Sequence, residues 1–172
     1  MVPGRRATLV TVAAPLPRRI YVAIGLVLTH PRFHPAHRRL YRWSGGRGVV
    51  SRALGVDMIL VTMTGRRSGD ARTIPLAAIR DGDAWVLVAT NAGKPKMPAW
   101  VHNLRSHPTV EVAHREQVGP HRAREAEGDE HGRLWSAAVA AYPGFAVYRE
   151  RTTRPIPLFV LEPVVIAPVE AS

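Results

Sequence analysis

The side chains best suited to chemistry lie in a glycine-bounded turn, Gly65-Arg66-Arg67-Ser68-Gly69. Glycines permit a tight backbone whose amide groups converge on an anion, and the two arginines and the serine add donors suited to phosphate oxygens. Arg72 follows closely enough to contribute a further donor. The turn therefore indicates an anion-binding site, although a hairpin turn with solvated arginines fits these residues equally well. It is not a Walker loop, because the required lysine is missing.

Metal binding and hydrolysis have little support in the sequence. His30, His34 and His37 have helical spacing, which could bind a metal ion, but prolines interrupt the segment and no acidic ligand is near. The chain has no cysteine, which excludes thiolate sites and suits a reducing compartment. No serine lies in a nucleophile elbow, and no pair of carboxylates stands out. We therefore expect no metal site and no hydrolase.

Three aromatic residues near the end of the chain form a second candidate group. Tyr142, Phe145 and Tyr148 are spaced by three, which places them on one side of a helical turn. Such a group could wall a flat ligand. From spacing alone, ordinary core packing is the favoured interpretation.

The elements that carry these residues predict a mainly β fold. Residues 58–64 are typical of a buried strand, and short turns join it to the next two strands, so these three form an antiparallel meander. The expected strands are residues 58–64, 73–79, 85–90, 110–112, 118–126 and 157–161. Helices are expected over residues 18–28, 37–43, 98–105 and 129–142, the last capped by Asp129 and stopped by Pro143-Gly144. Short strands separated by turns predict a small antiparallel barrel with short helices at its ends.

The length of 172 residues, 46% of them hydrophobic, predicts one folded domain with a short extension. We expect an N-terminal extension over residues 1–40, a barrel domain over residues 41–165 and a C-terminal tail over residues 166–172. The apolar stretch Ile20–Leu28 is far shorter than the roughly 20 residues that a membrane span needs. Its helix could lie on a membrane surface, but packing on its own domain is somewhat favoured. A cytoplasmic protein is expected, with peripheral contact at the inner face of the membrane as a further hypothesis.

The net charge of +11 comes from 24 lysines and arginines against 13 acidic residues. This excess attracts polyanions such as nucleic acid, acidic lipid or a phosphorylated cofactor. It is also the arginine-rich composition common in proteins from genomes of high GC content, so charge alone does not select a function.

Six segments, taken in order, resemble the deazaflavin (coenzyme F420)-dependent nitroreductase and quinone reductase family of actinobacteria. Each segment is modest by itself, but their order and spacing are specific, and the resemblance runs from about Tyr41 to Pro163. The segments are Leu60–Gly69, Arg72–Leu76, Arg80–Gly82, Pro98–Leu104, Ala141–Phe145 and Arg151–Pro157.

The resemblance implies a split β-barrel related to the flavin-binding barrel of pyridoxamine-phosphate oxidases. It also implies coenzyme F420, whose tail carries a phosphate and several glutamates, and transfer of a hydride from the reduced deazaflavin to a quinone or nitro compound. By this resemblance the arginine turn holds the phosphate and tail, and the other matched residues border the deazaflavin ring. The implied cofactor-binding residues are Arg66, Arg67, Ser68, Arg72, Pro75, Leu76, Val88, Ala89, Thr90, Asn91, Trp100 and Asn103.

The implied catalytic residues are Thr90, Tyr142 and Tyr148. The hydroxyl of Thr90 or Tyr142 could hydrogen-bond the acceptor oxygen as negative charge develops there. The chain departs from the family at Phe145, which lacks a hydroxyl, and at Ala77, where an aromatic residue is frequent. A wider or less polar acceptor pocket follows from these two residues.

Three other functions stay open at this point: an FMN- or haem-binding split barrel, a carrier of F420 without catalysis, and a basic barrel that binds nucleic acid. The last is least favoured, because the arginines concentrate in one turn and no regular aromatic platform is visible on the strands. The sequence does not predict the oligomeric state.

Overall fold

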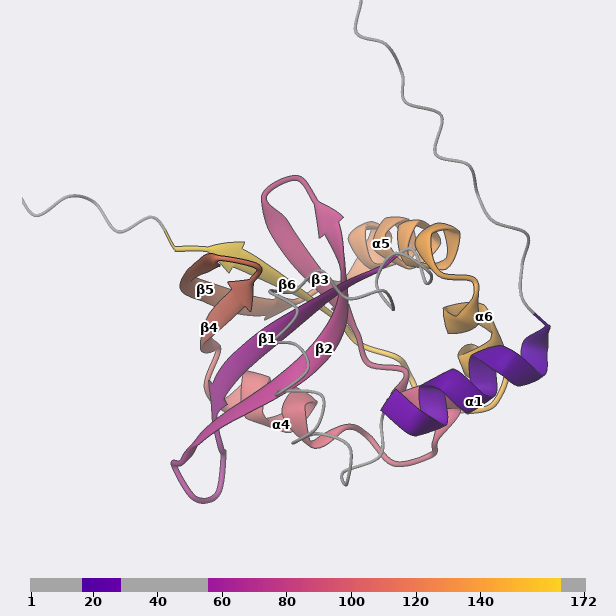
Figure 1. Ribbon diagram of the computed structural model, residues 1–172, viewed down its shortest axis with the longest axis horizontal. Helices are drawn as coiled ribbons and strands as arrows, with labels where there is room; N and C mark the ends of the chain where they lie inside the picture. The colour runs from indigo at the N-terminus through magenta and orange to yellow at the C-terminus, as the bar shows by residue number, and fades with distance from the viewer. Residues whose placement is uncertain (1–16, 29–55, 165–172) are drawn as a thin grey trace, which may run out of the picture.

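Six antiparallel strands close into a barrel within the part of the chain that the computed structural model describes, residues 17–28 and 56–164 (Figure 1). The strand order around the barrel is β1-β2-β3-β6-β5-β4, and β4 pairs with β1 to complete the ring. The strands are β1 (Asp57–Thr64), β2 (Ala71–Asp81), β3 (Ala84–Val88), β4 (Thr109–His114), β5 (Gln117–Glu125) and β6 (Leu158–Pro163).

Two short hairpins set the register of the barrel. Asp81 pairs with Ala84 across the turn between β2 and β3, where Gly82 adopts a φ of 59°. His114 pairs with Gln117 in the same way between β4 and β5. Two-residue hairpin turns need a positive φ, which glycine adopts without a side-chain clash. The register of each hairpin is therefore fixed locally.

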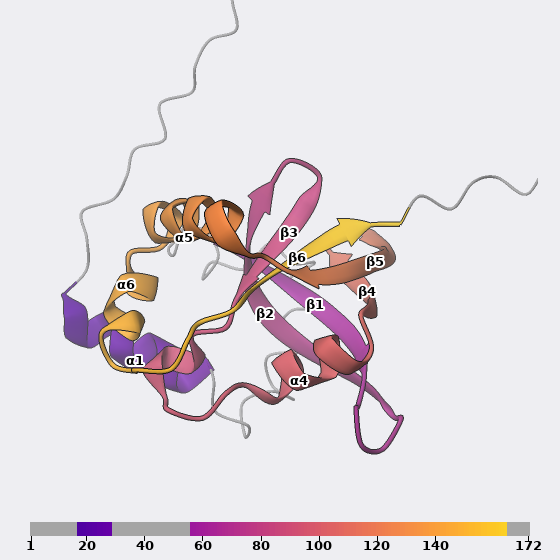
Figure 2. The ribbon, with the colours of Figure 1, turned by 180° about the vertical axis from the view of Figure 1, so that it is seen from behind.

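Most of the helices lie in the two long connections between consecutive strands. The helices are α1 (Arg18–Leu28), the short 3-10 helix η2 (Asn91–Gly93), α4 (Ala99–Ser106), α5 (Gly128–Ala141) and α6 (Gly144–Arg149). The segment between β3 and β4 carries η2 and α4, and the segment between β5 and β6 carries α5 and α6. In both views α1 lies beside α6, away from the strands (Figures 1 and 2). None of the helices in the described ranges is long and apolar enough to cross a membrane.

The alternation of side chains along β3 divides the core into two parts. Trp85 and Leu87 point into the barrel, where they join residues such as Phe159. Val86 points outward and packs with Leu134 of α5 under the helices. Successive side chains of a strand face opposite sides of a sheet, so one strand builds both the barrel core and the helix-facing core.

The predicted fold class, a small antiparallel barrel with short helices, is confirmed. Two details were wrong. The third strand ends at Val88 rather than Thr90, because the chain there enters a left-handed turn. Helix α5 begins at Gly128 with Glu127 as its N-cap residue, so Asp129 lies in the first turn and does not cap the helix. The predicted helix over residues 37–43 and the three histidines at 30, 34 and 37 fall outside the described residues.

Candidate functional site

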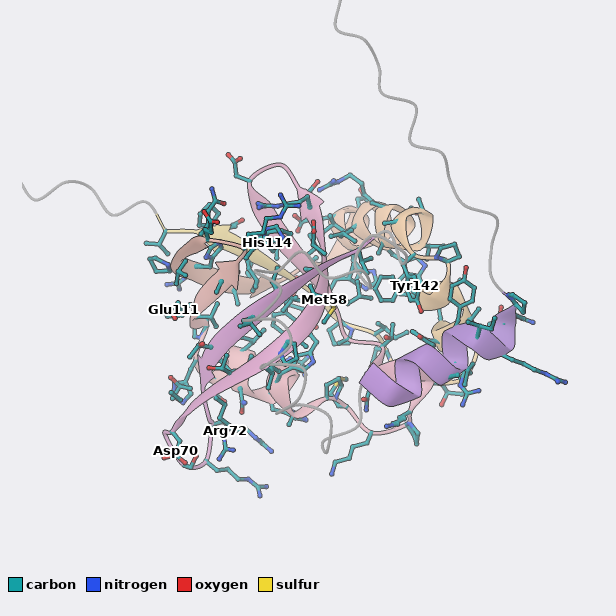
Figure 3. The ribbon with its side chains drawn as sticks, viewed as in Figure 1. Met58, Asp70, Arg72, Glu111, His114 and Tyr142 are labelled. Carbon is teal, nitrogen blue, oxygen red and sulfur yellow. The ribbon has the colours of Figure 1, made fainter. Side chains whose placement is uncertain are left out.

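A cavity of about 380 Å³ opens between β1, β2, the segment after β3, α4 and the junction of α5 with α6. Most of its walls are apolar, and a few polar or charged side chains, among them Lys96, also line it. Figure 3 shows Arg72 near the tip of the β1–β2 hairpin, Tyr142 at the opposite side beside α6, and Met58 between them. The predicted site residues that line the cavity are Arg72, Pro75, Leu76, Val88, Thr90, Asn91, Trp100, Asn103, Tyr142 and Tyr148.

The remaining predicted residues do not line the cavity. Arg66, Arg67 and Ser68 form the turn at its open end, and Ala89 is fully buried behind the wall. The backbone N–H of Arg66 donates to Oδ1 of Asn103 at 3.2 Å, which ties the turn to α4. The structure thus brings the arginine turn and the cavity together, with Asn103 joining them.

The arginine turn is held by its own backbone. The amide of Gly69 donates to the carbonyl of Gly65, and the amide of Gly65 donates to the carbonyl of Asp70, both at 2.8 Å. A Cβ atom at Gly65 would lie 3.0 Å from Nε of Arg72 and 3.0 Å from Oγ of Ser68, so these two side chains pack closely over Gly65. Nη2 of Arg72 donates to that serine oxygen at 3.3 Å.

The guanidinium groups of Arg66 and Arg67 are exposed, and within the described ranges neither makes a hydrogen bond or ion pair. They are therefore available to an external anion. Arginine forms strong, charge-assisted hydrogen bonds with phosphate and carboxylate oxygens, which gives the turn the chemistry that the sequence indicated.

A left-handed turn forms the cavity wall after β3. Asn91, Ala92 and Gly93 have φ values of 50°, 54° and 75°. A left-handed conformation costs a residue other than glycine about 1–2 kcal/mol, so the surrounding contacts must hold this turn in place. A Cβ atom at Gly93 would lie 2.5 Å from Cβ of Arg151 and 2.8 Å from the carbonyl oxygen of Tyr148. The turn is thus pressed against the end of α6.

Thr90, which precedes this turn, carries an unusual hydroxyl group. The residue is 4% exposed and lines the cavity. No hydrogen-bond partner for its side chain exists among residues 17–28 and 56–164. Buried hydroxyl groups nearly always have a partner, so an unpaired one in a cavity wall is suited to bind a ligand.

The tyrosines at the other end of the cavity form a hydrogen-bonded chain. Tyr148 donates its hydroxyl proton to the backbone carbonyl of Tyr21 at 2.6 Å. Because a phenol has one proton, Tyr142 must be the donor in the 3.0 Å bond between its hydroxyl and that of Tyr148. Burial and this bond raise the pKa of Tyr142. Tyr142 is therefore neutral near pH 7 and is not a base.

Contacts between aromatic rings also hold Tyr142 in place. The ring of Tyr142 meets those of Tyr21 and Phe145 edge-on, at centroid distances of 5.3 and 5.1 Å. Tyr142 precedes α6 rather than lying on it, and its ring covers Gly144, where a Cβ atom would approach within 2.4 Å. The aromatic group thus serves both as core packing and as a cavity wall.

Several residues of the site were not predicted from the sequence: Met58, Met63, Ile74, Lys96 and Met97 line the cavity, and Tyr21 and Arg154 support it. Tyr21 contributes a carbonyl and a ring from α1, and its segment lies outside the family resemblance. Arg154 lies within the resembling segment Arg151–Pro157, yet nothing in that segment indicated a role. Its guanidinium group donates to the carbonyl oxygens of Ala89 and Thr90 at 2.9 and 2.8 Å.

Comparison with known proteins agrees with this geometry. Residues 34–163 match the family model described as F420H(2)-dependent quinone reductase. The chain is 35% identical over 133 residues to an F420H(2)-dependent quinone reductase of Mycobacterium tuberculosis, which covers 73% of this chain and 86% of the relative. Among solved structures, an F420-H2 dependent reductase, FDR-A, is 40% identical with a TM-score of 0.57, over 61% of this chain and 93% of that one.

The chain belongs to the F420H(2)-dependent quinone reductase family. It is an F420-dependent oxidoreductase, and the predictions of the family and of the cofactor are confirmed. The site fits this cofactor: unpaired arginines suit an anionic tail, and the apolar cavity is within the range of about 300–1,000 Å³ that small-molecule sites occupy. A second solved structure, titled a domain-swapped dimer, is 40% identical with a TM-score of 0.58 over 61% of this chain and 79% of that one.

Substitution of Gly93 by alanine tests whether the left-handed turn is constrained. We expect a loss of roughly 2 kcal/mol or more in the free energy of unfolding, from the unfavourable φ and the clash with backbone. Gly132→Ala in α5 is the matched control, because a Cβ atom there has no neighbour within 4 Å; it should stabilise the protein by up to about 1 kcal/mol. Equal effects of the two changes in urea unfolding would show that the turn is not constrained.

Proposed function

We propose that the protein transfers a hydride from reduced F420 to a quinone, with nitro compounds as alternative acceptors. The observation that carries the proposal is the cavity, which is mostly apolar and has Arg72 in its lining, next to the turn that carries the unpaired guanidinium groups of Arg66 and Arg67. The name of the mycobacterial relative supports a quinone. When bound, F420 supplies the hydride, and a quinone that takes up a hydride and one proton becomes a hydroquinone.

The arginine turn binds the anionic tail in this proposal. Arg66, Arg67 and Ser68 hold the phosphate, and Arg72 lies where the tail meets the cavity. Pro75 and Leu76 of β2, with Trp100 and Asn103 of α4, border the deazaflavin ring. These side chains position the cofactor and exclude water from it.

The segment after β3 forms the other border of the ring. Val88, Thr90 and Asn91 line the cavity directly. Ala89 supports them from behind, because its carbonyl accepts a hydrogen bond from Arg154. Ala89 therefore shapes the ring site without lining it.

The acceptor end is apolar. Val56, Ala77, Ala92 and Phe145 contribute hydrocarbon surface to the cavity. Ala77 leaves room where a larger side chain would fill the space, and Phe145 offers no hydrogen bond. An uncharged, flat acceptor such as a quinone ring matches this surface better than a charged one.

Thr90 is the better candidate to stabilise charge on the acceptor oxygen. Its hydroxyl has a proton that no described group accepts, whereas the proton of Tyr142 is donated to Tyr148. Tyr142 could serve an acceptor only if its bond to Tyr148 broke. We therefore assign the donor role to Thr90, and give Tyr142 and Tyr148 the role of shaping the acceptor wall.

Replacement of both Arg66 and Arg67 by alanine tests the tail site. Each charge-assisted hydrogen bond contributes about 1.5–3 kcal/mol, so F420 affinity should fall at least about tenfold. The difference should shrink at high salt, where the native contacts are already screened. The matched control replaces Arg133 and Arg149 on α5 and α6, which removes the same charge far from the turn. Equal losses in both double variants, measured by fluorescence titration, would assign the effect to net charge.

Thr90→Val and Tyr142→Phe separate the two candidate donors. Removing one donor from a preorganised site lowers turnover by about 10²-fold or more, and Thr90→Val should slow the oxidation of reduced F420 by menadione to this degree. Tyr142→Phe should lower stability by about 1 kcal/mol, through its lost hydrogen bond, with a smaller effect on turnover. F420 affinity should stay near wild type in both. A larger loss of turnover in Tyr142→Phe than in Thr90→Val would move the donor role to Tyr142.

A further inference from the structure

Arg154 lies between α6 and β6 and is partly buried. Its guanidinium group donates from Nε to the carbonyl of Lys94 at 3.2 Å and from Nη2 to the carbonyls of Ala89 and Thr90. Nη1 contacts the carbonyl of Pro155 at 3.1 Å and Sδ of Met97 at 3.7 Å. Every one of these partners is neutral, and in residues 17–28 and 56–164 no carboxylate pairs with Arg154.

The partners of Arg154 flank the left-handed turn on both sides. The carbonyls of Ala89 and Thr90 precede the turn, and the carbonyl of Lys94 follows it. Within the turn, the amide of Gly93 donates to the carbonyl of Thr90 at 3.0 Å. One planar group therefore fixes the entrance and the exit of a turn whose backbone conformation is unfavourable for Ala92.

A lysine in place of Arg154 could not make the same set of hydrogen bonds. A guanidinium group presents five N–H donors in a rigid, planar fork, whereas the ammonium group of lysine offers donors from a single nitrogen atom. Burial lowers the pKa of Arg154, but arginine stays protonated in proteins. The positively charged guanidinium group thus binds backbone carbonyl groups and not a carboxylate.

We propose that Arg154 is the positioning residue of the reaction: it holds the left-handed turn so that the Thr90 hydroxyl faces the cavity. This inference rests on the proposed function for the role of Thr90. Arg154 does not line the cavity and touches neither cofactor nor acceptor directly. Its effect on turnover passes through the cavity-lining residues that it holds in place, and we assign that effect to Thr90.

Arg154→Lys tests the proposal first without any cofactor. The amides of Gly93 and Lys94 close the turn by donating to Thr90 and Asn91, and their hydrogen exchange should become about tenfold faster when the fork is lost. The exchange of the Val86 and Leu87 amides in β3 should not change. Arg151→Lys is the matched control, because the guanidinium group of Arg151 is exposed and makes no hydrogen bond in the described part of the chain, and lysine keeps the aliphatic stem that lies against Gly93.

A double-mutant cycle then tests the link to Thr90. Arg154→Lys should lower kcat for menadione reduction about tenfold in the wild-type background, and should have no further effect in a Thr90→Val background. Arg151→Lys should leave kcat unchanged in both backgrounds.

Three results would overturn the proposal. Unchanged exchange at Gly93 and Lys94 shows that Arg154 does not hold the turn, and additive effects on kcat show that it does not act through Thr90. If Arg154→Lys accelerates amide exchange in β3 as much as in the turn, Arg154 stabilises the whole fold and not the turn in particular. Failure of the wild-type protein to bind F420 is a different outcome, since it contradicts the proposed function and leaves the exchange experiment to judge Arg154 alone.

Discussion

The left-handed turn after β3 is the constraint on which the rest of the site depends. It ends the strand at Val88, places Thr90 and Asn91 in the cavity wall, and brings Gly93 against the last turn of α6. Since α6 carries Phe145 and Tyr148, the cavity wall after β3 and the aromatic cavity wall meet at Gly93. The barrel supplies a rigid frame. The shape of the cavity depends in addition on the left-handed turn, whose unfavourable backbone conformation at Ala92 is held by neighbouring groups such as Arg154.

The two ends of the cavity differ in charge. Arg66 and Arg67 are unpaired at the open end, where desolvation costs little and an anionic tail can be bound. At the far end Tyr142 is kept neutral by burial. Arg72 and Lys96 make part of the cavity wall positive, and the wall beside Tyr142 is uncharged. In the proposed function, this arrangement suits a ligand with a charged tail and an acceptor that carries no charge.

Local patterns in the sequence were enough to predict the barrel. Gly82 marks its hairpin because a two-residue turn needs a positive φ, and the apolar run at the start of the domain marks a buried strand. The left-handed turn was not predicted: Asn91 and Gly93 are residue types that adopt a positive φ readily, but Ala92 between them is not. The roles of Arg154 and Tyr21 were not predicted, because their partners are far away in the sequence. The hydrogen bond from Tyr148 to Tyr21, for example, joins residues 127 positions apart. The cofactor-binding residues came from the family resemblance, and the geometry then separated those that line the cavity from those that support it.

A side-by-side fluorescence titration of the purified protein with F420, FMN and FAD tests the central claim most directly. A cationic, anion-binding turn joined to a mostly apolar cavity predicts tighter binding of F420 than of either flavin. The F420 tail carries glutamate carboxylates in addition to its phosphate, and in the proposed function Arg66 and Arg67 pair with these groups. Tight binding of FMN with no detectable binding of F420 would contradict the account.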